Sequence, residues 1–143
     1  MLYERVVVTP VLQALILAEK VYRTDTGQYI LCGTFGTVEV APAPQLKEGN
    51  KIVGGEPGSS FAYINLTDVS DDTELELQFI SLSKNKVLFN TTLTVRCDDR
   101  LANIEIVCAL PHLIVPETGV YAFEIVSEGE IIGSHRVRGV VRN

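Results

Sequence analysis

The sequence has no tryptophan, one methionine and only three cysteines among its 143 residues. Cys32, Cys97 and Cys108 form no C-x-x-C pair, and their odd number excludes a fully paired disulfide scaffold and a zinc ribbon. Basic residues are also few, 12 against 18 acidic ones, and the net charge of -6 leaves no basic surface for binding nucleic acid. The five tyrosines and five phenylalanines are scattered, so they form no stacking platform for bases or sugars.

No apolar run is long enough to span a bilayer. The longest, Val6–Ala18, is interrupted by a proline and a glutamine. Glu4 cancels the charge of Arg5, and Ile16 stands where signal-peptide cleavage would need a small residue. We therefore expect no cleaved leader, a cytoplasmic location and reduced cysteines.

Short, alternating apolar segments dominate the rest of the chain, which is 46% hydrophobic. In one of them Leu75, Leu77 and Phe79 alternate with polar residues, as in a strand with one buried face and one wet face. About eight such strands predict an all-β, antiparallel two-sheet sandwich, immunoglobulin-like in broad architecture. The expected strands are Val11–Tyr22, Tyr29–Val40, Phe61–Thr67, Thr73–Ser81, Val87–Cys97, Ala102–Leu110, Val120–Ser127 and Glu130–Val141.

The expected domain organisation is an N-terminal arm of residues 1–10 followed by one sandwich domain of residues 11–143. Residues 41–60 are rich in proline and glycine and predict one long loop. The segment Leu12–Tyr22 is ambiguous, because its alanine, leucine, glutamate and lysine also favour a helix. We favour a strand, since the turn Asp25–Gly27 leads directly into the next strand.

Two stretches resemble a family of small bacterial proteins of unknown function. ALILAE from Ala14 and TGQYILCG from Thr26 are similar to that family's first strand, turn and G-K-x-x-I-L-G second strand. PETGVYAF from Pro116 and GEIIG from Gly129 are similar to its closing hairpin. Cys32 departs from the pattern, which has glycine directly after leucine. The resemblance implies the fold and carries over no activity, cofactor or site residue.

The tripeptide Asp25-Thr26-Gly27 matches the catalytic D-T-G of retropepsin-like proteases, in which two aspartates share one proton. Arg23 and Thr24 stand where that family has apolar residues, and a turn that needs a glycine with positive φ explains the tripeptide equally well. We expect no enzyme, and the protease remains a remote alternative.

The histidines and cysteines show no catalytic arrangement. His112 and His135 have no recognised serine or cysteine partner, and we expect them to be surface or half-buried side chains. The three cysteines fall in predicted strands, where we expect small buried hydrophobes.

Acidic residues recur in the connections after the third, fifth and seventh predicted strands. In an antiparallel sandwich successive connections alternate between the two ends, so these three share one end. That end would carry Asp68, Asp71, Asp72, Asp98, Asp99, Glu128 and Glu130. If the long loop keeps the alternation, Asp25 joins them, and Lys84, Lys86 and His112 lie at the opposite end.

Carboxylates clustered on loops can hold Ca²⁺, which takes six to eight oxygen ligands. Candidate ligands are Asp68, Asp71, Asp72, Asp98 and Asp99. Aspartate also favours hairpin turns for its backbone hydrogen bonds, and no D-x-D-x-D spacing is present. A Ca²⁺-dependent binding module is therefore the alternative function, and no other cofactor is expected.

The function that the sequence favours is a non-catalytic interaction or structural module. An apolar terminal segment normally frays unless it docks, and residues 1–8 contain Tyr3, Val6, Val7 and Val8. The long loop of residues 41–60 is a second contact element. We expect a homo-oligomer, or a complex with a protein partner, in which this arm adds to a neighbour's sheet edge.

Overall fold

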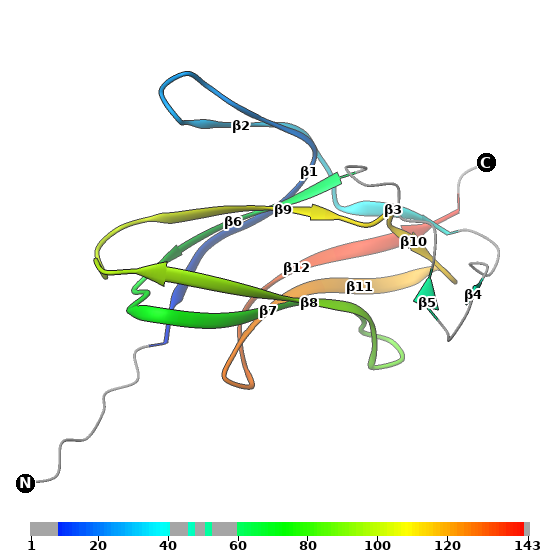
Figure 1. Ribbon diagram of the computed structural model, residues 1–143. Coiled ribbons are helices and arrows are strands. Elements are labelled where there is room, and N and C mark those ends of the chain that lie inside the picture. The colour runs from blue at the N-terminus through cyan, green and yellow to red at the C-terminus, as the bar shows by residue number, and fades with distance from the viewer. Residues whose placement is uncertain (1–8, 41–45, 48–50, 53–59, 142–143) are drawn as a thin grey trace, which may run out of the picture.

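Strands account for all the regular structure in the described part of the chain (Figure 1). The structure is a computed structural model, and it describes residues 9–40, 46–47, 51–52 and 60–141. Within these residues no helix is long and apolar enough to cross a membrane. The predicted all-β, two-sheet sandwich is confirmed, with two layers of strands packed face to face.

The smaller sheet has four strands, all antiparallel. Its order across the sheet is β2 (Tyr29–Thr34), β1 (Val11–Arg23), β6 (Ser60–Thr67) and β9 (Ile104–Leu110). β1 is a strand along its whole length, which settles the helix-or-strand ambiguity in favour of the strand. Its inward-facing side chains, such as Leu15 and Leu17, are buried in the core, which offsets a modest helical preference.

The larger sheet has six strands. Their order is β10 (Ile114–Val115), β3 (Thr37–Val40), β12 (Glu130–Val140), β11 (Gly119–Ser127), β7 (Asp71–Ser81) and β8 (Lys86–Cys97). The pairings of β12, β11, β7 and β8 are antiparallel, whereas β3 runs parallel to both of its neighbours. The predicted antiparallel arrangement therefore holds except around β3.

The core lies between the two sheets and is aromatic on the side of the larger one. Phe79 of β7 stacks on Phe123 of β11 with ring centroids 4.5 Å apart, and Phe89 of β8 packs against both rings. From the smaller sheet, Leu17 and Ile64 enter the same core with no exposed surface. These are the inward positions of the alternating pattern.

The predicted strand Tyr29–Val40 is wrong as a single element. Gly33, with φ of 70°, lies one residue before the end of β2 at Thr34, and after it the chain crosses to the other sheet. The Phe35 N–H donates to the Leu17 carbonyl of β1, and the Gly36 carbonyl accepts from the Arg138 N–H of β12. β2 and β3 therefore belong to different sheets.

The connection after β8 also crosses between the sheets. Residues 98–103 join β8 to β9, which pairs with β6 and not with its predecessor in the chain. The Asp68 N–H donates to the Arg100 carbonyl at 2.9 Å, so this crossing is fastened to the β6–β7 turn. In the predicted long loop, β4 (Leu46–Lys47) pairs with β5 (Lys51–Ile52), and the remaining loop residues lie outside the described ones.

Candidate functional site

β9 is an edge strand, because within the described residues only β6 pairs with it. Its sequence, IEIVCAL, contains no lysine and no proline, and its pairing with β6 has no bulge. Lysine, proline and bulges are the devices by which natural sheets prevent an edge from pairing with another chain. Among the described residues, β9 therefore presents a row of unpaired backbone donors and acceptors without any of these three devices.

The single charge of β9 is held by its own sheet. Glu105 of β9 pairs in register with Asn65 of β6, and its carboxylate accepts a short hydrogen bond from the Tyr63 hydroxyl. Partial burial and this hydrogen bond raise the pKa of the Tyr63 phenol above its usual value of 10.0. The Tyr63 ring also meets Tyr29 edge-on, with centroids 6.1 Å apart, which joins β9 to the β1–β2 hairpin. Glu105 is thereby anchored to β6.

The inward row of β9 is apolar and only half-buried. Ile104, Ile106 and Cys108 pack against the core from the edge of the sandwich. Burial raises the pKa of the Cys108 thiol, which keeps it a neutral, apolar side chain. Across the seam between the sheets, Phe89 and Leu93 of β8 are likewise half-buried. This apolar seam is incompletely covered by the described residues.

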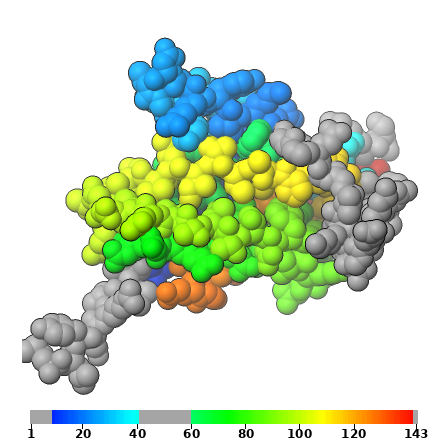
Figure 2. Space-filling model, in the orientation of Figure 1, coloured from blue at the N-terminus to red at the C-terminus, as the bar shows by residue number. Residues whose placement is uncertain are grey.

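The other long edge strand, β8, is polar on its outer face. Figure 2 shows β8 and β9 together on one face of the molecule, as the lime and yellow atoms. The outer row of β8 is polar, with Asn90 donating to Glu76 at 2.6 Å and Arg96 paired with Asp72 at 3.3 Å. The strand begins at Lys86, and its pairing with β7 contains a bulge at Phe79/Ile80. β8 therefore has the protection that β9 lacks.

The structure brings the predicted acidic connections to the same end of the strands. We define this acidic end as Asp68, Asp71, Asp72, Asp98, Asp99, Glu128 and Glu130. Register shows the arrangement, because Asp71 lies opposite Cys97, and Ser127 lies opposite both Leu75 and Glu130. Glu128 and Gly129 form a two-residue hairpin turn with φ of 49° and 78°.

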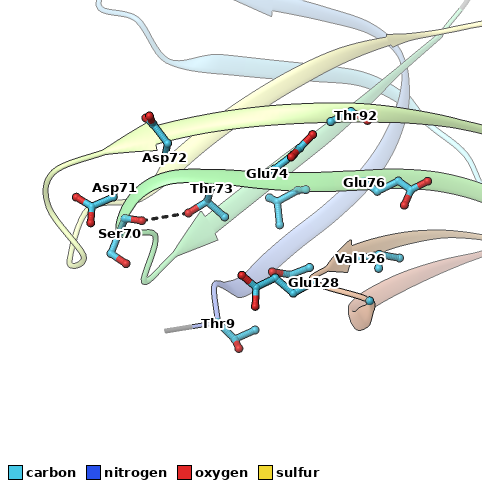
Figure 3. A pocket seen from close by; sticks show the side chains of 13 residues that line it. Thr9, Ser70, Asp71, Asp72, Thr73, Glu74, Glu76, Thr92, Val126 and Glu128 are labelled. Atoms are coloured by element: carbon cyan, nitrogen blue, oxygen red, sulfur yellow. Dashed lines mark hydrogen bonds between the residues drawn. The ribbon is translucent and has the colours of Figure 1, made fainter. Parts of the chain in front are cut away.

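A groove of about 600 Å³ runs along β7 at this end, and its carboxylates point in different directions (Figure 3). Asp72 projects on one side of β7, whereas Glu128 lies on the other side beside Thr9. The remaining lining residues include Ser70, Asp71, Glu74 and Glu76.

Three of the five predicted calcium ligands have other partners. The Asp68 carboxylate accepts from the Thr67 hydroxyl at 2.9 Å, Asp99 accepts from the Leu101 N–H at 2.9 Å, and Asp72 pairs with Arg96. Asp98 is exposed. In the described part of the chain, no three His, Cys, Asp or Glu side chains are placed to hold a metal ion. Calcium binding stays a prediction from the sequence.

Asp25 does not join the acidic end, contrary to the expectation from strand alternation. β1 is antiparallel to β6, with Val11 opposite Thr67, so β1 begins at the end of β6 that leads to Asp68 and leaves the sheet at the other end. The β1–β2 hairpin then stands over the outer face of the smaller sheet, well apart from the β6–β7 turn (Figure 1). Asp25 is exposed in its turn, next to Gly27 with φ of 85°.

The cysteines and histidines occupy separate places. Cys32 is exposed on β2, so the expectation of a buried residue is wrong there, whereas Cys97 and Cys108 are half-buried. His112 lines a second cavity, of about 290 Å³, together with Glu19 and Phe35. His135 is half-buried on β12.

The predicted N-terminal arm lies mostly outside the described residues. Its proposed contact residues, Tyr3, Val6, Val7 and Val8, are among those that the structure does not describe. Their role in assembly stays a prediction.

The comparisons with known proteins identify the family. Residues 13–138 match the family of unknown function DUF6941, from within β1 to within β12. The chain belongs to the DUF6941 family. No curated protein matches it. The DUF6941 match agrees with the resemblance to a family of unknown function, and it assigns no activity to β9 or to the acidic end.

Sequence reasoning did not single out the edge of this DUF6941 protein. Tyr63 and Glu105 are 42 residues apart, and nothing near either one signals their contact. The absence of lysine and proline in residues 104–110 is visible in the sequence. That absence marks an open edge only once the strand order is known.

Proposed function

We propose that this protein is a non-catalytic interaction module that binds an extended polypeptide segment along the free edge of β9. The observation that carries the proposal is the unprotected seven-residue edge, which lacks lysine, proline and a bulge. In strand addition, the backbone of the edge supplies hydrogen bonds, and alternate side chains of the incoming strand find pockets beside it.

The surroundings of the edge define the chemistry of the partner. An added strand would place every second side chain beside Ile104, Ile106 and Cys108, where the seam between the sheets is half-exposed. Apolar residues at alternate positions would complete the burial of that seam. On the outer side the strand would meet Val107, Ala109 and a carboxylate already held by Tyr63.

Self-assembly is the form of this function that the sequence favours. Met1–Val8 supplies a candidate donor strand, with valines at three successive positions. The net negative charge disfavours anionic partners such as nucleic acid. It is compatible with binding through backbone hydrogen bonds.

The test uses two capped peptides, one copying residues 1–8 and one copying residues 104–110, added to the full-length protein. Amide hydrogen exchange followed by NMR reports which backbone groups become protected. We expect at least one peptide to slow exchange at alternate amides of Ile104–Leu110, because one side of the strand already donates to β6. Chemical-shift changes should concentrate on β9 and on the seam.

Matched control peptides carry proline at alternate positions and cannot form a ladder. They should leave the exchange of β9 unchanged. The exchange is measured at a dilution at which light scattering shows a monomer, so that a second copy does not already protect the edge. Protection by the proline peptides, or no protection of monomeric β9 by either unmodified peptide, contradicts the proposal.

A further inference from the structure

We infer that the partner of β9 is β9 of a second copy of this chain, paired antiparallel about Val107. This inference rests on the proposed function and names the segment that occupies the edge. Seven residues, Ile104–Leu110, place Val107 at the centre of the strand. A two-fold axis at Val107 therefore pairs the strand with itself along its full length.

The charges of β9 fit this register. Around Val107, Glu105 lies opposite Ala109 of the partner subunit, and Ala109 lies opposite Glu105 of the partner subunit. No like charges meet, although each chain carries a net charge of -6. The Tyr63 hydroxyl holds Glu105 toward β6, which keeps the only carboxylate of the strand engaged with its own sheet.

The apolar residues fit it as well. On the inward face, Ile106 lies opposite Cys108 of the partner subunit, and Ile104 lies opposite Leu110 of the partner subunit. Ile104, Ile106 and Cys108 are half-buried in the single chain, so the pairing buries an apolar row against its own equivalent. In the dimer, the four-stranded sheets of the two copies join edge to edge into one continuous sheet.

β8 offers a poorer self-interface. Lys86 and Arg96 stand near its two ends, its outer row is polar, and Arg96 is already paired with Asp72. The connection to β9 adds Asp98 and Asp99 beside the end of the strand.

Charge substitutions at Ala109 test the register. Ala109 is exposed, so neither variant should unfold the chain. Ala109→Glu places one carboxylate opposite Glu105 of the partner subunit in each of the two equivalent pairs, whereas Ala109→Lys places one ammonium group there. We expect the dimer dissociation constant, measured by light scattering and sedimentation, to rise roughly 2- to 30-fold in the glutamate variant. It should fall by a similar factor in the lysine variant.

Cross-linking gives a second readout. In a background without the three native cysteines, Val107→Cys should be captured by a short thiol cross-linker as a covalent dimer. Ala109→Cys, which faces Glu105 of the partner subunit, is the matched control and should react more slowly.

Each alternative result overturns the inference in a recognisable way. If Ala109→Glu and Ala109→Lys change the dimer dissociation constant equally, or if neither changes it, the register about Val107 is excluded. A dimer lost on deleting residues 1–8 makes the N-terminal arm the occupant. A monomer at every concentration, with β9 still protected by peptide, excludes self-pairing and leaves the proposed function standing. A monomer without such protection overturns both.

Discussion

The two long edge strands, β8 and β9, follow each other in the chain and differ in how far their free edges are protected from pairing with another chain. β8 has a bulge, a lysine at its start and a polar outer row bonded to β7. β9 has an uninterrupted ladder with β6, an apolar composition and one carboxylate secured by Tyr63. Because both strands face the same solvent, exposure alone does not explain the contrast. The proposed pairing of β9 with another chain accounts for it, since an edge that pairs with another chain needs no protection from pairing.

Loosening the support of β8 is expected to have the largest effect. Phe79 is 2% exposed and packs against Phe89 of β8 and Phe123 of β11. Phe79→Ala should lower the free energy of unfolding by about 3–5 kcal/mol, because it leaves a cavity in the aromatic core. Urea denaturation measures the loss, and amide exchange should accelerate more in β8 than in β9.

The control for this variant is Leu101→Ala, at a side chain 88% exposed. It should change stability by less than about 0.5 kcal/mol. Equal acceleration of exchange in β8 and β9 would show that the two edges do not depend on separate parts of the core.

Freeing the carboxylate of β9 is expected to have an intermediate effect. Tyr63→Phe removes the hydroxyl that donates to Glu105 but keeps the ring against Tyr29. Stability should fall by about 1 kcal/mol, in line with the loss of one hydrogen bond. Self-association should also weaken, because Glu105 is no longer held toward β6. Reduced stability with unchanged self-association would show that this hydrogen bond stabilises the fold without affecting pairing at the β9 edge.

High pH should act on the same contact. The pKa of Tyr63 is raised, first by burial and then by the hydrogen bond to Glu105, so the folded state favours the protonated phenol. Its contribution to stability is therefore complete below the unfolded pKa of about 10 and is lost as the pH rises through the folded value.

Unfolding of the wild type and of Tyr63→Phe, compared between pH 9 and pH 11, measures this contribution. The variant should lose less stability over the interval. Tyr121, whose pKa is also raised mainly by burial, titrates in both proteins and cancels in the comparison. Parallel curves would contradict the assignment to Tyr63.

Removing the exposed ion pair of β8 is expected to have a small effect. Arg96 and Asp72 are 3.3 Å apart, with 81% and 69% of their side-chain surfaces exposed. Arg96→Ala should therefore cost less than about 1 kcal/mol, and 1 M salt should abolish the difference from wild type. A larger, salt-resistant loss would mean that Arg96 contributes by packing.

Calcium is expected to have the smallest effect. The carboxylates around the groove diverge, and Asp72 pairs with Arg96. Elsewhere at the acidic end, Asp68 and Asp99 already accept hydrogen bonds. Millimolar Ca²⁺ should leave the melting temperature unchanged relative to Mg²⁺. A rise with Ca²⁺ alone would support the metal site that the sequence predicts at Asp71, Asp72 and their neighbours.

Much of the fold was predictable from local pattern. Alternation in residues 73–81 and 87–97 assigns the buried and wet faces of β7 and β8 correctly, because side chains on a strand have a period of two. Turn residues mark most strand ends, as Glu128 and Gly129 do between β11 and β12.

The errors concern where the chain changes sheet. The sequence predicts a single strand across Gly33 and Gly36, because its apolar pattern continues through the segment in which the chain leaves the side of β1 and joins β12. Counting the connections through this segment as one strand then places Asp25 at the wrong end, because β1 is antiparallel to β6. Residues 98–103 likewise look like an ordinary hairpin turn, although they connect the two sheets.

The sequence by itself determined most of the longer strands, their inner and outer faces and the concentration of acidic residues in three connections. These properties depend on residues that are neighbours in the chain. Only the tertiary structure decided which strands are edges, and with them the open seam at β9 and the contact between Tyr63 and Glu105. Strand pairing joins segments far apart in sequence through backbone hydrogen bonds that every residue type can form. The local pattern therefore carries almost no record of the partner.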